Sequence, residues 1–103
     1  MDWYTIEYLY PQSFNQFKDM MFPNTGILSL SVLENYDNKK LYHFFDKKNV
    51  FLIVEKFKHN QWVYTITTND IVFGPGDFQS SREKIEENGF NECFRILEKI
   101  LNS

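Results

Sequence analysis

Hydrophobic and polar positions follow a strand pattern between residues 50 and 73. Residues 50–58 open with a continuous apolar run, as expected of a strand covered on both faces for part of its length. Residues 61–68 alternate between two faces, and His59 and Asn60 in between suit a tight turn because Asn tolerates positive φ. Residues 71–73 form a third short run. The pattern therefore predicts a three-stranded antiparallel meander.

Helical spacing replaces this alternation in the last part of the chain. From about residue 81 to residue 101, the apolar stripe consists of Ile85, Phe90, Cys93, Phe94, Leu97, Ile100 and Leu101. Ser80 and Glu83 have the spacing of a capping box, which predicts where the helix begins. Gly89 lies inside this stripe, where Gly costs about 1 kcal/mol relative to Ala. We expect it to allow close approach of the helix to the sheet; a helix break at Asn88 and Gly89 is the alternative.

The N-terminal half has a less regular pattern. Residues 3–10 are aromatic and β-prone, which predicts a short strand or an extended arm that ends at Pro11. Ser13 and Gln16 again have capping-box spacing and predict the start of a helix. The apolar face of that helix consists of Phe14, Phe17, Met20 and Met21. The helix is expected to end in residues 22–26, which contain Pro23 and Gly26.

The apolar positions between residues 33 and 45 are closer to helical than to alternating spacing, and whether residues 27–49 hold one helix or two stays open. With 103 residues, the chain is too short for two independent cores. We therefore predict a single α+β domain over residues 1–103. Its parts are a helical N-terminal half, a three-stranded antiparallel β-meander, and a long C-terminal helix packed on the sheet.

Aromatic residues make up 18% of the chain, which is more than one small core needs. Some of them are therefore expected on the surface, where Tyr and Trp are typical of contact sites. The candidates for partner binding are Tyr8, Tyr10, Trp62 and Tyr64. For Trp62 and Tyr64, burial on the helix-covered face of the sheet is the alternative.

The net charge of −3 gives no overall attraction to nucleic acid or to an anionic membrane. The middle of the chain differs, because residues 39–59 hold six lysines and two acids and so carry +4. A solvated face is the first interpretation of this segment. The alternative is an RNA-binding surface in which Lys47, Lys48, Lys56 and Lys58 contact phosphates.

The residue types that carry chemistry are sparse. Cys93 is the only cysteine, so no intramolecular disulfide forms, and a reducing compartment fits best. We interpret Cys93 as a small buried hydrophobic residue. His43, Asp46 and His59 lack the spacing of a metal site, so we expect no metal and no cofactor. The N-terminus does not look like a secretory signal, and no apolar run approaches 18 residues. These features predict a cytoplasmic protein without a membrane span, and not an enzyme.

The predicted order of helix, three strands and helix over roughly residues 33–101 is similar to that of the double-stranded RNA-binding domain. That family carries a Lys-rich phosphate clamp at the start of its last helix. The matching positions here are Arg82, Glu83, Lys84, Glu86 and Glu87, which are mixed to acidic. This departure removes the family's main electrostatic contact, so the resemblance concerns topology and carries no function by itself.

Several short stretches resemble small uncharacterised phage and prophage proteins of the Bacteroidetes type. They are Met1-Asp2-Trp3-Tyr4, Met21-Phe22-Pro23-Asn24, Lys40-Leu41-Tyr42, Phe44-Phe45-Asp46 and Gly89-Phe90-Asn91-Glu92-Cys93-Phe94. The resemblance implies a mobile-element origin, and small acidic phage proteins often block a host factor, including CRISPR effectors. We therefore expect a non-enzymatic inhibitor or modulator that binds a host protein or ribonucleoprotein in the host cytoplasm. An anti-CRISPR is its sharpest form, and an RNA-binding module is the alternative.

Overall fold

The computed structural model describes residues 1–21, 37–69, 71–74 and 79–103. The helices are α1 (Trp3–Leu9), α2 (Pro11–Met21), α3 (Asn38–Lys47) and α4 (Arg82–Leu101), and the strands are β1 (Phe51–Lys56), β2 (Trp62–Thr67) and β3 (Val72–Phe73). The strands form one antiparallel sheet in the order β1-β2-β3. The predicted α+β class and the order of elements from residue 38 onward are confirmed.

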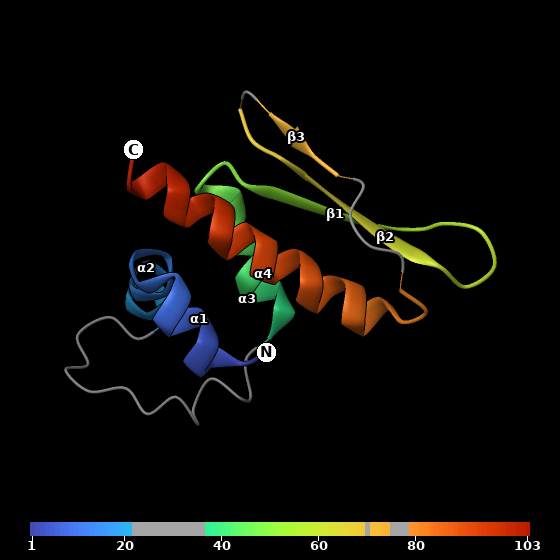
Figure 1. Cartoon of the computed structure of the whole chain (residues 1–103), viewed down its shortest axis with the longest axis horizontal. Helices are drawn as coiled ribbons and strands as arrows, with labels where there is room; N and C mark the ends of the chain where they lie inside the picture. Colours follow the sequence, from blue (N-terminus) through green and yellow to red (C-terminus); the bar gives the residue numbers. More distant parts are fainter. Residues whose placement is uncertain (22–36, 70, 75–78) are drawn as a thin grey trace.

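The long helix α4 lies between the sheet and the N-terminal helices. Figure 1 shows the sheet above α4, with α1 and α2 below it and α3 behind it. On one face of β1 and β2, Leu52, Tyr64 and Ile66 belong to the core beneath α4, whereas Lys56 at the end of β1 is exposed. One continuous core therefore joins elements from both ends of the chain.

Aromatic rings form the centre of this core. The ring of Phe94 on α4 lies 5.9 Å from that of Trp3, 6.0 Å from that of Phe17 and 4.9 Å from that of Phe45, measured between centroids. All three contacts are edge-to-face, the geometry that aromatic quadrupoles favour. Phe94 thus connects α1, α2 and α3 to the helix that covers the sheet.

The prediction of a short strand or an extended arm at residues 3–10 is wrong, because residues 3–9 form α1. Asp2 caps this helix, and its carboxylate accepts hydrogen bonds from the Thr5 amide at 3.2 Å and the Thr5 hydroxyl at 2.7 Å. Trp3 and Ile6, three residues apart, are buried in the core. Local capping and tertiary burial therefore outweigh the β propensity of the aromatic residues.

Two predicted helix starts differ from those observed. Helix α2 begins at Pro11, whose fixed φ suits the first helical position, and Ser13 lies inside the helix rather than capping it. Helix α4 is capped by Ser81 rather than Ser80, and the Ser81 hydroxyl accepts from the Lys84 amide at 3.3 Å. Helix α3 begins after Asp37, and the question of a second helix before it concerns residues 22–36, outside the described residues.

Among the described residues, only one face of strand β1 is covered, contrary to the prediction of coverage on both faces for part of its length. Leu52 is buried under α4, whereas Phe51 is 38% and Ile53 46% exposed on the opposite face. The hairpin that follows is as predicted. His59 and Asn60 have φ of 48° and 61°, and the Phe57 amide donates to the Gln61 carbonyl at 2.6 Å.

Gly89 marks the closest approach of α4 to the sheet. The helix is continuous through Asn88 and Gly89, so the alternative of a break is wrong. A Cβ at position 89 would lie 2.6 Å from Leu52 Cδ1 and 3.1 Å from Leu52 Cδ2. A Cβ at this position would displace Leu52, which explains a glycine in the middle of a buried helix face.

Gly89→Leu should lower the free energy of unfolding by about 1–3 kcal/mol, because the larger side chain overpacks the contact with β1. Gly89→Ala should cost less, since the gain in helix propensity of about 1 kcal/mol offsets part of the clash. Urea unfolding measures both. Adding Leu52→Ala to Gly89→Leu should recover part of the loss. If Gly89→Leu unfolds like the wild type, close approach does not explain the glycine.

Candidate interaction surfaces

The outward face of α1 carries two exposed aromatic rings. Tyr4 is 74% and Tyr8 84% exposed, and they stand four residues apart on one helix face, with Glu7 between them. Neither ring stacks on another ring within the residues that the structure describes. The opposite face of α1 is anchored in the core through Trp3 and Ile6. The two tyrosines are therefore displayed on a firmly packed helix.

The structure separates the four predicted aromatic candidates. Tyr8 is exposed, and Tyr10 is half-buried at the end of α1, where its amide donates to the Ile6 carbonyl at 2.8 Å. Tyr64 is only 9% exposed and belongs to the core, so it is not available as a surface anchor. Trp62 is half-buried, and the guanidinium carbon of Arg82 lies 5.7 Å from its ring centroid.

Sequence reasoning missed Tyr4. The signal was present, because Tyr4 and Tyr8 have the spacing that brings side chains together on a helix. The sequence pattern predicted an extended conformation for this stretch. Tyr4 and Tyr8 would share a face in that conformation too, but no helix would hold the two rings in place. The face formed by Tyr4, Glu7 and Tyr8 is named the α1 face below.

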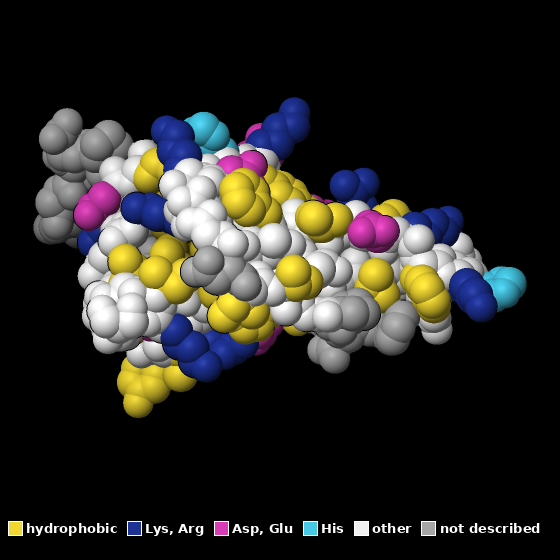
Figure 2. Space-filling view, turned by 90° about the horizontal axis from the view of Figure 1, so that it is seen from above, with side chains coloured by type: hydrophobic (Ala, Val, Ile, Leu, Met, Phe, Trp, Pro, Cys, Tyr) yellow, Lys and Arg dark blue, Asp and Glu magenta, His cyan; other side chains and the backbone are white. Residues whose placement is uncertain are grey.

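The four lysine candidates are all exposed but stand at two ends of one strand. Lys47 and Lys48 close α3 just before β1, and Lys56 and Lys58 lie at the far end of β1 and in the hairpin. A six-residue strand separates the two pairs by roughly 20 Å. Figure 2, which views the molecule from the side of the sheet, likewise shows basic side chains dispersed over the surface rather than gathered in one patch. Lys48 also lies over the Phe44 ring, at 5.9 Å from its centroid.

The uncovered face of the sheet is a second apolar surface. Phe51 and Ile53 of β1 share this face with Val63 of β2 and Val72 of β3, as the strand register requires. Phe51, Ile53 and Val72 are exposed, whereas Val63 is buried among its neighbours. Figure 2 views the molecule from the side on which the sheet lies, and hydrophobic side chains are visible along much of the length of the molecule.

Three partly or fully buried titratable side chains have structural roles. The Tyr42 hydroxyl donates to Glu86 at 2.8 Å; burial, and then this carboxylate, raise the pKa of Tyr42. Burial also raises the pKa of the Cys93 thiol, which is inaccessible, as predicted. Burial alone would raise the pKa of Glu98, but hydrogen bonds from Ser13, Gln12 and Asn102 outweigh it and hold the pKa below its ordinary value.

Metal-ligating side chains do not gather anywhere in the described part of the chain. No group of three His, Cys, Asp or Glu residues there has the geometry to hold an ion. His43 lies exposed on α3 and His59 at the tip of the hairpin, so the candidate set from the sequence is not brought together by any one element. Among the described residues, no helix is long and apolar enough to cross a membrane.

Comparison with known proteins gives no match, whether to protein-family models, to curated proteins or to solved structures.

Proposed function

We propose that this protein is a non-enzymatic interaction protein of phage or prophage origin that inhibits or modulates a host macromolecule. The observation that carries the proposal is the α1 face, with Tyr4 74% and Tyr8 84% exposed on either side of Glu7. Exposed tyrosines on a firmly packed helix provide large contact area at a low cost in conformational entropy, which is typical of binding hot spots. The origin follows from the resemblance of the sequence to phage proteins.

Charge favours a basic partner surface. Residues 1–38 carry five acids and one lysine, and the chain as a whole carries −3. A carboxylate beside two tyrosine rings suits an arginine, whose guanidinium can pair with the acid and stack on a ring. CRISPR effectors hold their guide heteroduplex in a positively charged channel. An acidic, aromatic helix face complements such a channel, and we therefore propose an anti-CRISPR as the most specific form of this function.

A cleavage assay with guide-loaded CRISPR effectors from Bacteroidetes tests this proposal. The wild-type protein should inhibit target cleavage, and Tyr8→Ala should weaken inhibition by roughly 30-fold, as expected of a hot-spot residue worth about 2 kcal/mol. Phe51→Ala removes an exposed ring from the uncovered sheet face and serves as the matched control, with inhibition unchanged. Equal potency of wild type and Tyr8→Ala would contradict the assignment to the α1 face, and no inhibition of any effector would contradict the anti-CRISPR proposal.

A second candidate function, RNA binding, is favoured by the exposure of Lys47, Lys48, Lys56 and Lys58. The acids Glu83 and Glu87, exposed at the start of α4, oppose it, because like charge repels a polyanion. A gel-shift series with single- and double-stranded RNA at about 50 mM and 200 mM salt separates the two functions. Tight, salt-sensitive binding that is lost when the four lysines are changed to Glu would favour RNA binding over a protein partner.

A further inference from the structure

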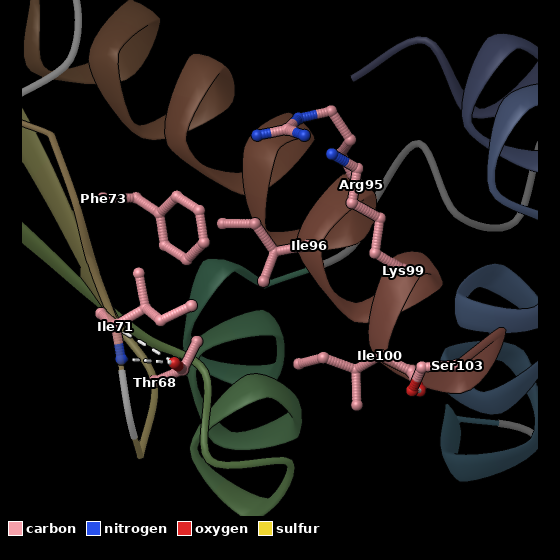
Figure 3. Close-up of a pocket in the computed structure, with 8 residues that line it drawn as sticks. All are labelled: Thr68, Ile71, Phe73, Arg95, Ile96, Lys99, Ile100 and Ser103. Carbon is pink, nitrogen blue, oxygen red and sulfur yellow. Dashed lines mark hydrogen bonds between the residues drawn. The ribbon is translucent and has the colours of Figure 1, made fainter.

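A pocket of about 260 Å³ lies on the sheet side of α4, near the end of that helix. Figure 3 shows Phe73 and Ile71 from the β3 region on one side of it and Ile96 and Ile100 of α4 on the other. Helices α1 and α2 pack on the opposite side of α4, so this pocket is separate from the α1 face (Figure 1). Its walls are apolar side chains from the β3 region and from α4.

The polar groups around the floor of the pocket are already paired. The Thr68 hydroxyl accepts from the Ile71 amide at 3.1 Å and donates to the Ile71 carbonyl at 3.3 Å. The Thr68 amide donates to the same carbonyl at 2.8 Å. The Ser103 hydroxyl, also in the lining, donates to the Ile100 carbonyl at 2.7 Å. The hydroxyls and the Ile71 amide thus have no donor left for a ligand, and the part of a ligand that lies between the apolar walls should itself be apolar.

Two cations stand at the rim, and only one is uncommitted. Arg95 is held by Glu92 on the same helix, with its Nη2 at 2.7 Å and its Nε at 3.0 Å from the carboxylate oxygens. Lys99 is exposed and forms no ion pair within the described part of the chain. In Figure 3 the side chains of Arg95 and Lys99 extend from α4 on the side of Ile96 away from Ile71 and Thr68, and both residues belong to the lining. The rim therefore presents an unneutralised positive charge.

We propose that this pocket binds a small amphipathic carboxylate, with its alkyl chain between Phe73 and Ile96 and its carboxylate at Lys99. The apolar walls select the chain by the hydrophobic effect, and the single free cation selects the anionic head. The pocket volume is below the usual range for drug-sized ligands, so a medium-length chain fits better than a bulky molecule. This site stands independently of the proposed function, because it uses other residues on another side of α4.

Titration of the isotope-labelled protein with decanoate, decanol and decylamine, followed by amide NMR shifts, tests the site. Decanoate should bind with a dissociation constant of about 0.1–1 mM, the range of a ligand of about a dozen heavy atoms with modest efficiency. Decanol should bind more weakly and decylamine most weakly. The amides of Thr68, Ile71 and Lys99 should shift, while those of α1 should not. Equal affinity for all three ligands, or no binding of decanoate, would overturn the proposal.

Variants at exposed positions separate the two parts of the site. Lys99→Met should weaken decanoate binding by about 2- to 5-fold, as for a surface ion pair, and Lys99→Glu should reverse the preference in favour of decylamine. Lys84→Glu, on the same helix far from the pocket, is the matched control and should leave the order of affinities for the three ligands unchanged. Ile100→Asn should weaken the binding of all three ligands by about tenfold, because it removes apolar contact from the pocket wall.

Other occupants give different results in the same experiment. A short Leu-rich peptide with acidic residues that binds more tightly than decanoate at the same amides would assign the pocket to a protein segment and overturn the small-molecule proposal. Sedimentation at the NMR concentration detects a second copy of the chain. Self-association that decanoate does not displace would likewise overturn the proposal.

Discussion

Phe94→Ala should lower the free energy of unfolding by about 3–5 kcal/mol, the usual cost of removing a buried aromatic ring. Phe94 is completely buried, and its ring contacts Trp3, Phe17, Phe44 and Phe45. These rings come from three other helices, so no single neighbour can move to fill the space. Since small domains have about 5–15 kcal/mol of total stability, the loss is a large part of it.

Urea and thermal unfolding measure this effect. Each kcal/mol should lower the Tm by roughly 4–8 °C for a domain of about 100 residues. Tyr8→Ala, which truncates a ring that is 84% exposed on α1, is the matched control and should change stability by less than about 1 kcal/mol. A similar loss in both variants would mean that the cluster around Phe94 is not the centre of the core.

Glu98→Ala should lower the free energy of unfolding by about 2–4 kcal/mol. The reason is that the Glu98 carboxylate, from a distant part of the chain, caps the first turn of α2. Its carboxylate accepts from the Ser13 amide at 2.8 Å, the Ser13 hydroxyl at 3.0 Å and the Gln12 amide at 3.3 Å. Those amides belong to the first turn of α2, where backbone N–H groups have no partner within the helix. Removing the acceptor leaves a buried donor unsatisfied.

The effect of Glu98 should depend on pH. The pKa of Glu98 in the folded protein lies below its ordinary value of 4.5, so the ionised form stabilises the fold. This contribution is fully present above the ordinary pKa and is lost as the pH falls through the folded pKa. The difference in unfolding free energy between wild type and Glu98→Gln should therefore be largest near pH 7 and shrink below about pH 4.5.

The control for Glu98 is Glu83→Ala, at an exposed position in the first turn of the same helix, which should cost less than about 1 kcal/mol. If Glu98→Ala is no worse than Glu83→Ala, the cap contributes little. If the difference between wild type and Glu98→Gln grows as the pH falls, the direction of the pKa shift is wrong.

Local chemistry in the sequence was enough to predict some parts of the fold. The turn at His59 and Asn60 follows from the backbone tolerance of single residues, and the course of α4 follows from a stripe of apolar positions over 20 residues. Gly89 was also interpretable, because a glycine inside such a stripe requires a reason. The turn and the helix depend on neighbours that are close in sequence, whereas the residue that Gly89 approaches, Leu52, could not be named from the stripe alone.

The misassigned features depend on distant residues. The capping-box spacing of Ser13 was misleading, since its true partner is Glu98, 85 residues away. For Tyr64, the sequence allowed either a surface position or burial under the helix. Tyr64 pairs with Val54 of β1, and the continuous apolar run in residues 50–54 does not show which face of β1 meets a helix. The helix that displays Tyr4 and Tyr8 is held in place by the packing of Trp3 on rings of α2 and α4, at Phe17 and Phe94. A single sequence does not carry such information.

The link between Ser13 and Glu98 also determines when the protein can fold during its synthesis. Helices α1 and α2 leave the ribosome first, but the ring and the carboxylate that hold them, at positions 94 and 98, are added about 80 residues later. Until then the apolar faces of both helices have no α4 to pack against, and helices this short are marginal in water alone. Folding of the N-terminal region is therefore coupled to completion of α4, because Trp3 and Phe17 lack the ring of Phe94 until that residue has been added.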